Sequence, residues 1–77
     1  MDEYRAFLLN AGQAIKAARE GAGLSQTRLA RMAGTSQNAI SCYESGKVCM
    51  TAWTLHKLCE ALKVSADELL GLGEGCE

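Results

Sequence analysis

The 77-residue sequence contains no proline, and aromatic residues make up only 5% of it. Proline is the strongest helix breaker, so its absence leaves long helical segments uninterrupted. The β-branched and aromatic residues that favour strands are also few. Alanine, leucine, glutamate, lysine, arginine and glutamine dominate instead, and these residues have the highest helix propensity. The composition therefore predicts an all-α fold.

The sequence also lacks the residue clusters on which metal binding and catalysis depend. His56 is the only histidine, and the four cysteines form no CxxC pair. A structural zinc site needs four such ligands at suitable spacing. We find no paired carboxylates, no Ser/His/Asp set and no phosphate-binding loop. We therefore expect no metal, no cofactor and no enzymatic activity.

Signals for export or membrane insertion are absent as well. The first stretch, MDEYRAFLLNAG, begins with acidic residues, and its apolar run is too short for a signal peptide or a membrane span. Disulfides form mainly in oxidising compartments. We therefore expect a cytoplasmic protein with no membrane partner and with reduced thiols at Cys42, Cys49, Cys59 and Cys76.

No large excess of charge of either sign is present. The net charge is −1, but residues 1–47 carry +2 and residues 48–77 carry −3. The total argues against a simple basic protein that binds nucleic acid through charge alone. The uneven distribution predicts a mildly positive end and a negative end.

Apolar residues recur at helical spacing in five segments. We expect helices over residues 2–20, 26–33, 37–45, 52–63 and 66–70, with Gly12 as a weak point that could split the first. Ser25, Ser36, Thr51 and Ser65 are suited to cap helix starts, and Ser65 with Glu68 has the pattern of a capping box. We predict a single domain over residues 1–72, followed by a flexible tail over 73–77.

Residues 26–45 are the most informative unit. They form two short predicted helices joined by a turn at Gly34, with the small Ala30 in the first helix and Ile40 in the second. The small residue lets the two helices approach closely. This arrangement is the helix-turn-helix pattern.

The sequence GLSQTRLARMAGTSQNAISCYESGK, followed by LHKLCEALKVSADELL, closely resembles the phage-repressor/Cro (XRE) family of helix-turn-helix regulators. The resemblance covers roughly residues 11–70. It implies a compact five-helix, lambda-repressor-like DNA-binding domain. It also implies a sequence-specific transcriptional regulator, a repressor that binds a short palindromic operator in double-stranded DNA as a homodimer.

The resemblance carries roles over to individual residues. Base contacts are implied for Gln37, Asn38, Ser41 and Cys42. Phosphate contacts or positioning are implied for Ser25, Gln26, Ser36, Ser45 and Lys47, and Gln26 is also expected to brace Gln37. Arg19 and Glu44 match a structural ion pair. The terminal helix, with Leu69 and Leu70, is expected to contribute to a two-fold dimer interface.

The amides suit this role on chemical grounds, because glutamine and asparagine can bind adenine through a paired donor and acceptor. The sequence also departs from the family. Relatives often carry Arg or Lys where this chain has Cys42 and Val48, and Pro where it has Met50. Fewer cations predict weaker non-specific affinity for DNA.

Two residues leave alternatives open. Cys42 either contacts a thymine methyl group or acts as an exposed redox thiol. Trp53 either forms an apolar patch with Met50 and Val48, where a protein partner binds, or folds back onto the domain. The patch supports an alternative function, which is a protein-interaction or antitoxin-like module of the same fold with weak or no DNA binding.

Overall fold

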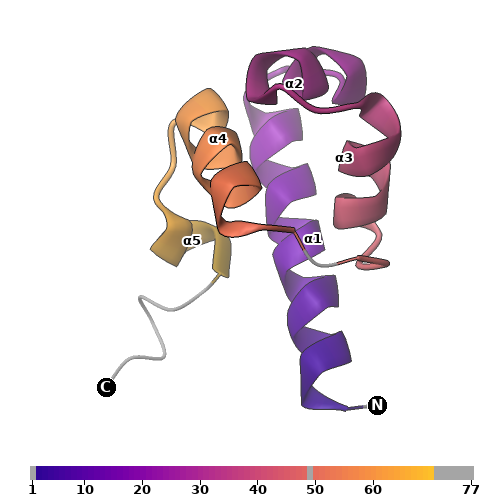
Figure 1. Cartoon of the computed structure of the whole chain (residues 1–77). Coiled ribbons are helices and arrows are strands. Elements are labelled where there is room, and N and C mark those ends of the chain that lie inside the picture. The colour runs from indigo at the N-terminus through magenta and orange to yellow at the C-terminus, as the bar shows by residue number, and fades with distance from the viewer. Residues whose placement is uncertain (1, 49, 71–77) are drawn as a thin grey trace.

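The computed structural model describes residues 2–48 and 50–70, and for Leu70 it describes the backbone alone. The chain folds into five helices, which are α1 (Glu3–Gly21), α2 (Gln26–Ala33), α3 (Gln37–Glu44), α4 (Ala52–Leu62) and α5 (Ala66–Leu70) (Figure 1). The described residues contain no strand, and the predicted all-α five-helix fold is confirmed. The predicted domain end at residue 72 and the predicted tail lie outside the described residues.

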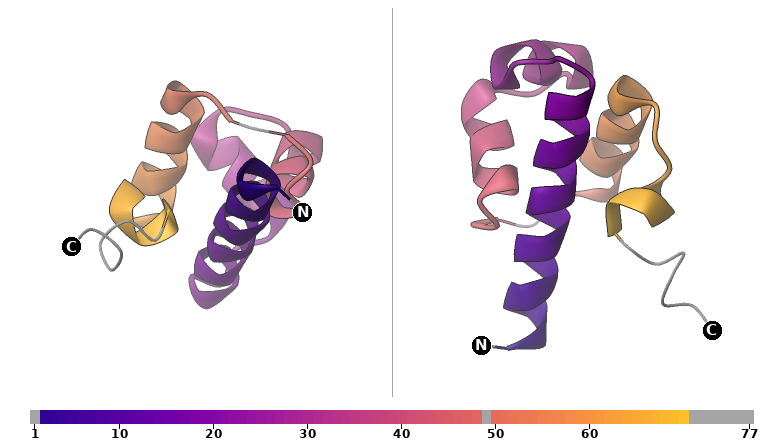
Figure 2. Two further views of the ribbon diagram at one scale, coloured as in Figure 1. Left: turned by 90° about the horizontal axis from the view of Figure 1, so that it is seen from below. Right: turned by 180° about the vertical axis from the view of Figure 1, so that it is seen from behind.

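The long helix α1 lies at the centre of the molecule. Helix α2 crosses its C-terminal end, α3 lies along one side, and α4 lies along the other (Figures 1 and 2). Helix α5 packs against α1 and α4. None of the helices in the described part of the chain is both long and apolar enough to cross a membrane.

The helix starts are capped as the sequence predicts. Ser25 Oγ accepts a hydrogen bond from Arg28 N at 3.0 Å, and Ser36 Oγ accepts one from Ala39 N at 3.1 Å. The predicted capping box is also present, because Ser65 Oγ accepts from Glu68 N at 3.1 Å while Glu68 Oε1 accepts from Ser65 N at 3.0 Å. Each cap satisfies backbone N–H groups that have no partner inside the helix.

Helices α1 to α4 are each followed by a residue whose backbone is in the left-handed region. Gly23, Gly34 and Gly46 follow α1, α2 and α3 with φ of 74°. Lys63 follows α4 with φ of 60°, although the sequence predicted it as the last helical residue. The helix stops before Lys63 because the left-handed turn lets Val64 N donate to Cys59 O at 3.1 Å, which satisfies a terminal carbonyl.

The core is built from aliphatic side chains of all five helices. Ile15, Leu29, Ile40 and Leu58 are the largest fully buried ones. Leu69, on α5, joins this core and is 3% exposed. Its side chain is thus used inside the chain and has almost no surface left for the dimer interface expected from the sequence.

Gly12 does not split α1, which is one unbroken helix. A Cβ at this position would lie 2.4 Å from Tyr43 O and 2.6 Å from Glu44 O, so only glycine lets the backbone of α3 come this close. The expectation of a weak point was therefore wrong in this position. Contact with α3 holds the helix together here and outweighs the low helix propensity of glycine.

Candidate nucleic-acid interface

The residues expected to contact bases lie together on α3. Gln37 and Asn38 occupy its first turn and are exposed, while Ser41 and Cys42 follow one turn later and are half-buried. Ile40 is fully buried on the inner side, and Tyr43 packs against the core beside it. Helix α3 therefore presents a polar, uncharged face whose position is fixed by the core beneath it.

The two serines that cap α2 and α3 can each donate a hydrogen bond to a group outside the protein. Ser25 and Ser36 are exposed, and each hydroxyl oxygen accepts a backbone hydrogen bond. A serine that accepts in this way still has its own O–H to donate. The N-terminus of a helix also favours anions, because its free N–H groups and its dipole are positive there. Both helix starts are therefore suited to phosphate.

The C-terminal end of α3 is less uniform. Lys47 is exposed and follows the turn at Gly46. Ser45 is exposed too, but its Oγ donates to Cys42 O at 3.1 Å, so its hydrogen is already used within the helix end. Of these two expected phosphate contacts, Lys47 is the one whose donors are available without rearrangement.

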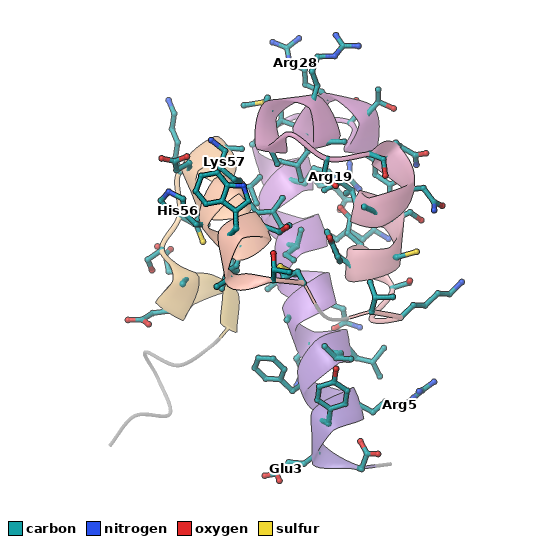
Figure 3. All side chains as sticks on the ribbon, viewed as in Figure 1. Glu3, Arg5, Arg19, Arg28, His56 and Lys57 are labelled. Carbon is teal, nitrogen blue, oxygen red and sulfur yellow. The ribbon has the colours of Figure 1, made fainter. Side chains whose placement is uncertain are left out.

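A buried ion pair joins α1 to α3. Arg19 Nε lies 2.6 Å from Glu44 Oε2, and Arg19 Nη2 lies 3.2 Å from Glu44 Oε1. Arg19 Nη1 also donates to Leu24 O at 2.8 Å. The hydrogen bond to Glu44 raises the pKa of Arg19, burial opposes this effect, and the charges of Glu44 and Glu20 add to it. Figure 3 shows Arg19 between the two helices, as the implied pairing requires.

The ion pair continues into a chain of hydrogen bonds that reaches the exposed face. Gln26 Nε2 donates to Glu44 Oε1 at 3.0 Å, and Gln37 Nε2 donates to Gln26 Oε1 at 2.6 Å. We call these four side chains, Arg19, Glu44, Gln26 and Gln37, the polar relay. It connects three helices and runs from a buried carboxylate to an exposed amide.

The relay fixes the orientation of both amides. An ionised carboxylate only accepts hydrogen bonds, so Gln26 must turn its NH₂ group toward Glu44 and its carbonyl toward Gln37. Gln37 must then donate to that carbonyl with one N–H. Its other N–H and its Oε1 remain free. This donor and acceptor can pair with N7 and the N6 amino group of an adenine.

Sequence reasoning missed two parts of this arrangement. The resemblance implied an Arg19–Glu44 pair and a Gln26–Gln37 contact, but not the bond from Gln26 to Glu44 that joins them. It also gave no role to Gly12, whose missing side chain lets α1 and the end of α3 meet. A glycine inside an otherwise strong helical pattern was the available signal for close packing.

The other residues singled out from the sequence lie outside α3. Arg28 points outward from α2 (Figure 3), and Arg31 is likewise exposed. Trp53, on α4, is 68% exposed and does not fold back into the domain. Val48 is exposed too, but Met50 packs against the core, so the expected three-residue patch does not form as one exposed surface.

The comparisons with known proteins agree with this geometry. Residues 15–69 match the model of the helix-turn-helix family. The restriction-modification controller protein C.AhdI from Aeromonas hydrophila is 31% identical, with a TM-score of 0.81, over 83% of this chain and 97% of that one. The P22 c2 repressor, solved with a synthetic operator, is 35% identical, with a TM-score of 0.75, over 78% and 91%.

A more distant structure shares the fold alone. The clp gene regulator ClgR from C. glutamicum is 24% identical, with a TM-score of 0.80, over 99% of this chain and 95% of that one. No curated protein sequence matches the chain. The chain belongs to the helix-turn-helix family, and within it to the phage-repressor/Cro (XRE) type of transcription regulator.

Proposed function

We propose that the protein is a sequence-specific DNA-binding regulator of transcription, acting in the cytoplasm as a repressor on a short palindromic operator. The observation that carries this proposal is the polar relay, which holds the exposed amide of Gln37 in one orientation. A solvated surface glutamine would need no such support. A side chain held in place loses little conformational entropy when it binds.

Base reading falls to the exposed side of α3. Gln37 offers its free N–H and Oε1 to an adenine, and Asn38 beside it offers the same pair of groups. Ser41 and Cys42 lie one turn further, where Cys42 suits contact with a thymine methyl group. The hydroxyls of Ser25 and Ser36, the amide of Gln26 and the ammonium of Lys47 hold the phosphates, with a smaller share for Ser45.

The affinity of one copy is expected to be low. Helix α3 is the proposed reading helix, and Arg19, the one cation of the polar relay beneath it, is neutralised by Glu44. Phosphate contacts provide most of the affinity of such proteins and make it sensitive to salt. A two-fold dimer doubles these contacts and places its reading helices about 34 Å apart, one turn of DNA. Half-sites at that spacing are the expected operator.

Selection of bound sequences from random duplexes tests the proposal. We expect an enriched palindrome with adenine at the position that Gln37 faces. Gln37→Ala should cost about 1–3 kcal/mol of discrimination at that base pair and leave folding unchanged. Gln13→Ala, which removes an exposed amide from α1, is the matched control and should bind like the wild type. Recovery of no enriched sequence would refute the proposal.

The exposure of Trp53 favours a second candidate, a protein-interaction or antitoxin-like module. A large aromatic side chain that is 68% exposed often marks a binding surface. This candidate predicts a stable complex with another protein and no mobility shift with any duplex. A shift that disappears in Gln37→Ala but survives in Gln13→Ala would decide for DNA.

A further inference from the structure

Helix α4 carries a patterned group of side chains that the DNA interface does not use. Trp53, His56, Lys57 and Glu60 follow one another at helical spacing on its outer side, and we call them the α4 face. Lys57 Nζ lies 5.6 Å from the ring centroid of Trp53, and the His56 ring lies 5.7 Å from it. Lys57 Nζ also lies 3.2 Å from Glu60 Oε1, and His56 Nε2 lies 3.5 Å from Glu60 Oε2.

These contacts order Trp53 without covering it. The lysine and histidine lie beside the ring on the same helix (Figure 3 labels both), and the ring still exposes 68% of its surface. An indole held against its own helix has already lost part of its freedom, so binding to it costs less entropy. Tryptophan is among the residues that most often anchor protein interfaces.

The charges of the α4 face point to its partner. Two copies of α4 can pair antiparallel about a two-fold axis. If the axis passes at the level of the helix midway between positions 58 and 59, Lys57 of each copy lies opposite Glu60 of the other. Like charges do not meet, and the helix dipoles oppose each other. Trp53 then covers the C-terminal end of the other copy's α4. We propose that the α4 face binds a second copy of this chain.

This inference rests on the proposed function, because it assigns the interface of the proposed dimer. Leu69, which the sequence placed at that interface, is 3% exposed in its own chain. Helix α4 lies on the side of α1 away from α3 (Figures 1 and 2), so pairing through α4 leaves both reading helices uncovered. A palindromic operator requires that arrangement.

The size of the face sets the strength of the dimer. Helix α4 has 11 residues, or a length of about 16 Å, and one face of it falls below the roughly 800 Å² per partner of a standard interface. The free dimer is therefore weak and dependent on concentration. A palindrome holds two copies side by side, raises their effective concentration and strengthens the pairing.

Sedimentation equilibrium over a range of concentrations tests the pairing of the full chain. Trp53→Ala should weaken dimerisation ~10- to 100-fold, as expected for loss of an anchor residue. Met32→Ala, which truncates another exposed apolar residue (43% exposed), on α2, should leave it unchanged. Circular dichroism and the melting temperature show whether each variant folds. A folded Trp53→Ala with wild-type dimerisation overturns the inference, and so does a wild type that stays monomeric.

A charge exchange tests the register. Lys57→Glu and Glu60→Lys should each weaken the dimer, because each places like charges opposite one another. The double variant should regain part of the loss, since the exchanged charges again meet opposite ones. A double variant at least as weak as the sum of the single ones would contradict the antiparallel pairing.

Binding to a palindrome and to a single half-site separates this inference from the proposed function. Trp53→Ala should lower affinity for the palindrome and leave the half-site unaffected. Equal affinity of the variant and the wild type for the palindrome overturns the interface while the DNA function stands. If the wild type binds neither duplex, the proposed function fails, and the sedimentation results alone decide about the α4 face.

Discussion

The two helices that flank α1 expose their side chains in different ways. The amide at the start of α3 is tied through Gln26 and Glu44 to a buried arginine, so its orientation depends on three helices. The indole of α4 contacts His56 and Lys57 on the same helix. Changes deep in the fold should therefore reach the α3 face but not the α4 face.

The supports beneath the two helices also differ in chemistry. On the α3 side, a buried carboxylate and a close backbone contact at Gly12 fix the position of the helix. On the α4 side, Leu58 and Leu62 are buried and Cys59 packs beside them, with a left-handed Lys63 at the end. Hydrogen bonds specify direction, whereas apolar contacts provide stability with less demand on geometry.

Loss of the buried carboxylate should have the largest effect. Glu44→Ala leaves Arg19, 11% exposed at its side chain, without its partner, and should cost about 3–5 kcal/mol of folding stability. It also frees Gln26 and thereby Gln37. Glu20 lies 3.8 Å from the same arginine but is 59% exposed, so Glu20→Ala should cost less than about 1 kcal/mol. Urea denaturation of both variants measures the difference, and equal losses would show that the relay has no special role.

A side chain at the contact between α1 and α3 should come next. Gly12→Ala forces the backbones apart and should destabilise by about 1–3 kcal/mol. Gly21 is also in α1, and a Cβ there would meet no atom within 4 Å. Gly21→Ala should be neutral or stabilise by up to about 1 kcal/mol, because alanine has the higher helix propensity. Thermal unfolding compares the two, and a tolerated Gly12→Ala would argue against the close contact.

The end of α4 should respond with a smaller change of opposite sign. Lys63→Gly removes the strain of a left-handed lysine and should stabilise by about 0.5–1 kcal/mol. Lys63→Ala removes the charge but keeps the strain, so it should bring no such gain. Denaturation midpoints distinguish them. Similar gains in both variants would assign the effect to charge rather than to backbone conformation.

The smallest expected effect is the pH dependence of folding stability that Cys59, on α4, contributes. Burial, with a contribution from Glu68, raises the pKa of the Cys59 thiol above its ordinary value of 9.0. A raised pKa in the folded state gives stability that is present below pH 9.0 and is lost as the pH rises through the folded pKa. The wild type should therefore lose slightly more stability between pH 8 and 10 than Cys59→Ala. Identical slopes of unfolding free energy against pH would contradict this prediction.

Much of the fold could be read from local patterns, as particular residues show. Ser25 and Ser36 cap the helices they were expected to cap, because capping depends on residues three positions apart. One expectation failed where a distant segment decides. Gly12 was expected to weaken α1, but the chain brings the end of α3 against it. Leu69, expected at a dimer interface, lies in the core of its own chain, and its place at that interface stays a prediction.

The sequence by itself determined the helices, their caps and the identity of the amides on α3. Helical periodicity and capping act over a few residues, so the order of residues is enough to predict them. Only the tertiary structure decided that Glu44 binds Gln26 as well as Arg19, and that Trp53 is exposed while Leu69 is buried. Those outcomes depend on how all five helices approach one another in space. A hydrogen bond between residues 18 positions apart forms only when packing has brought its donor and acceptor within about 3 Å.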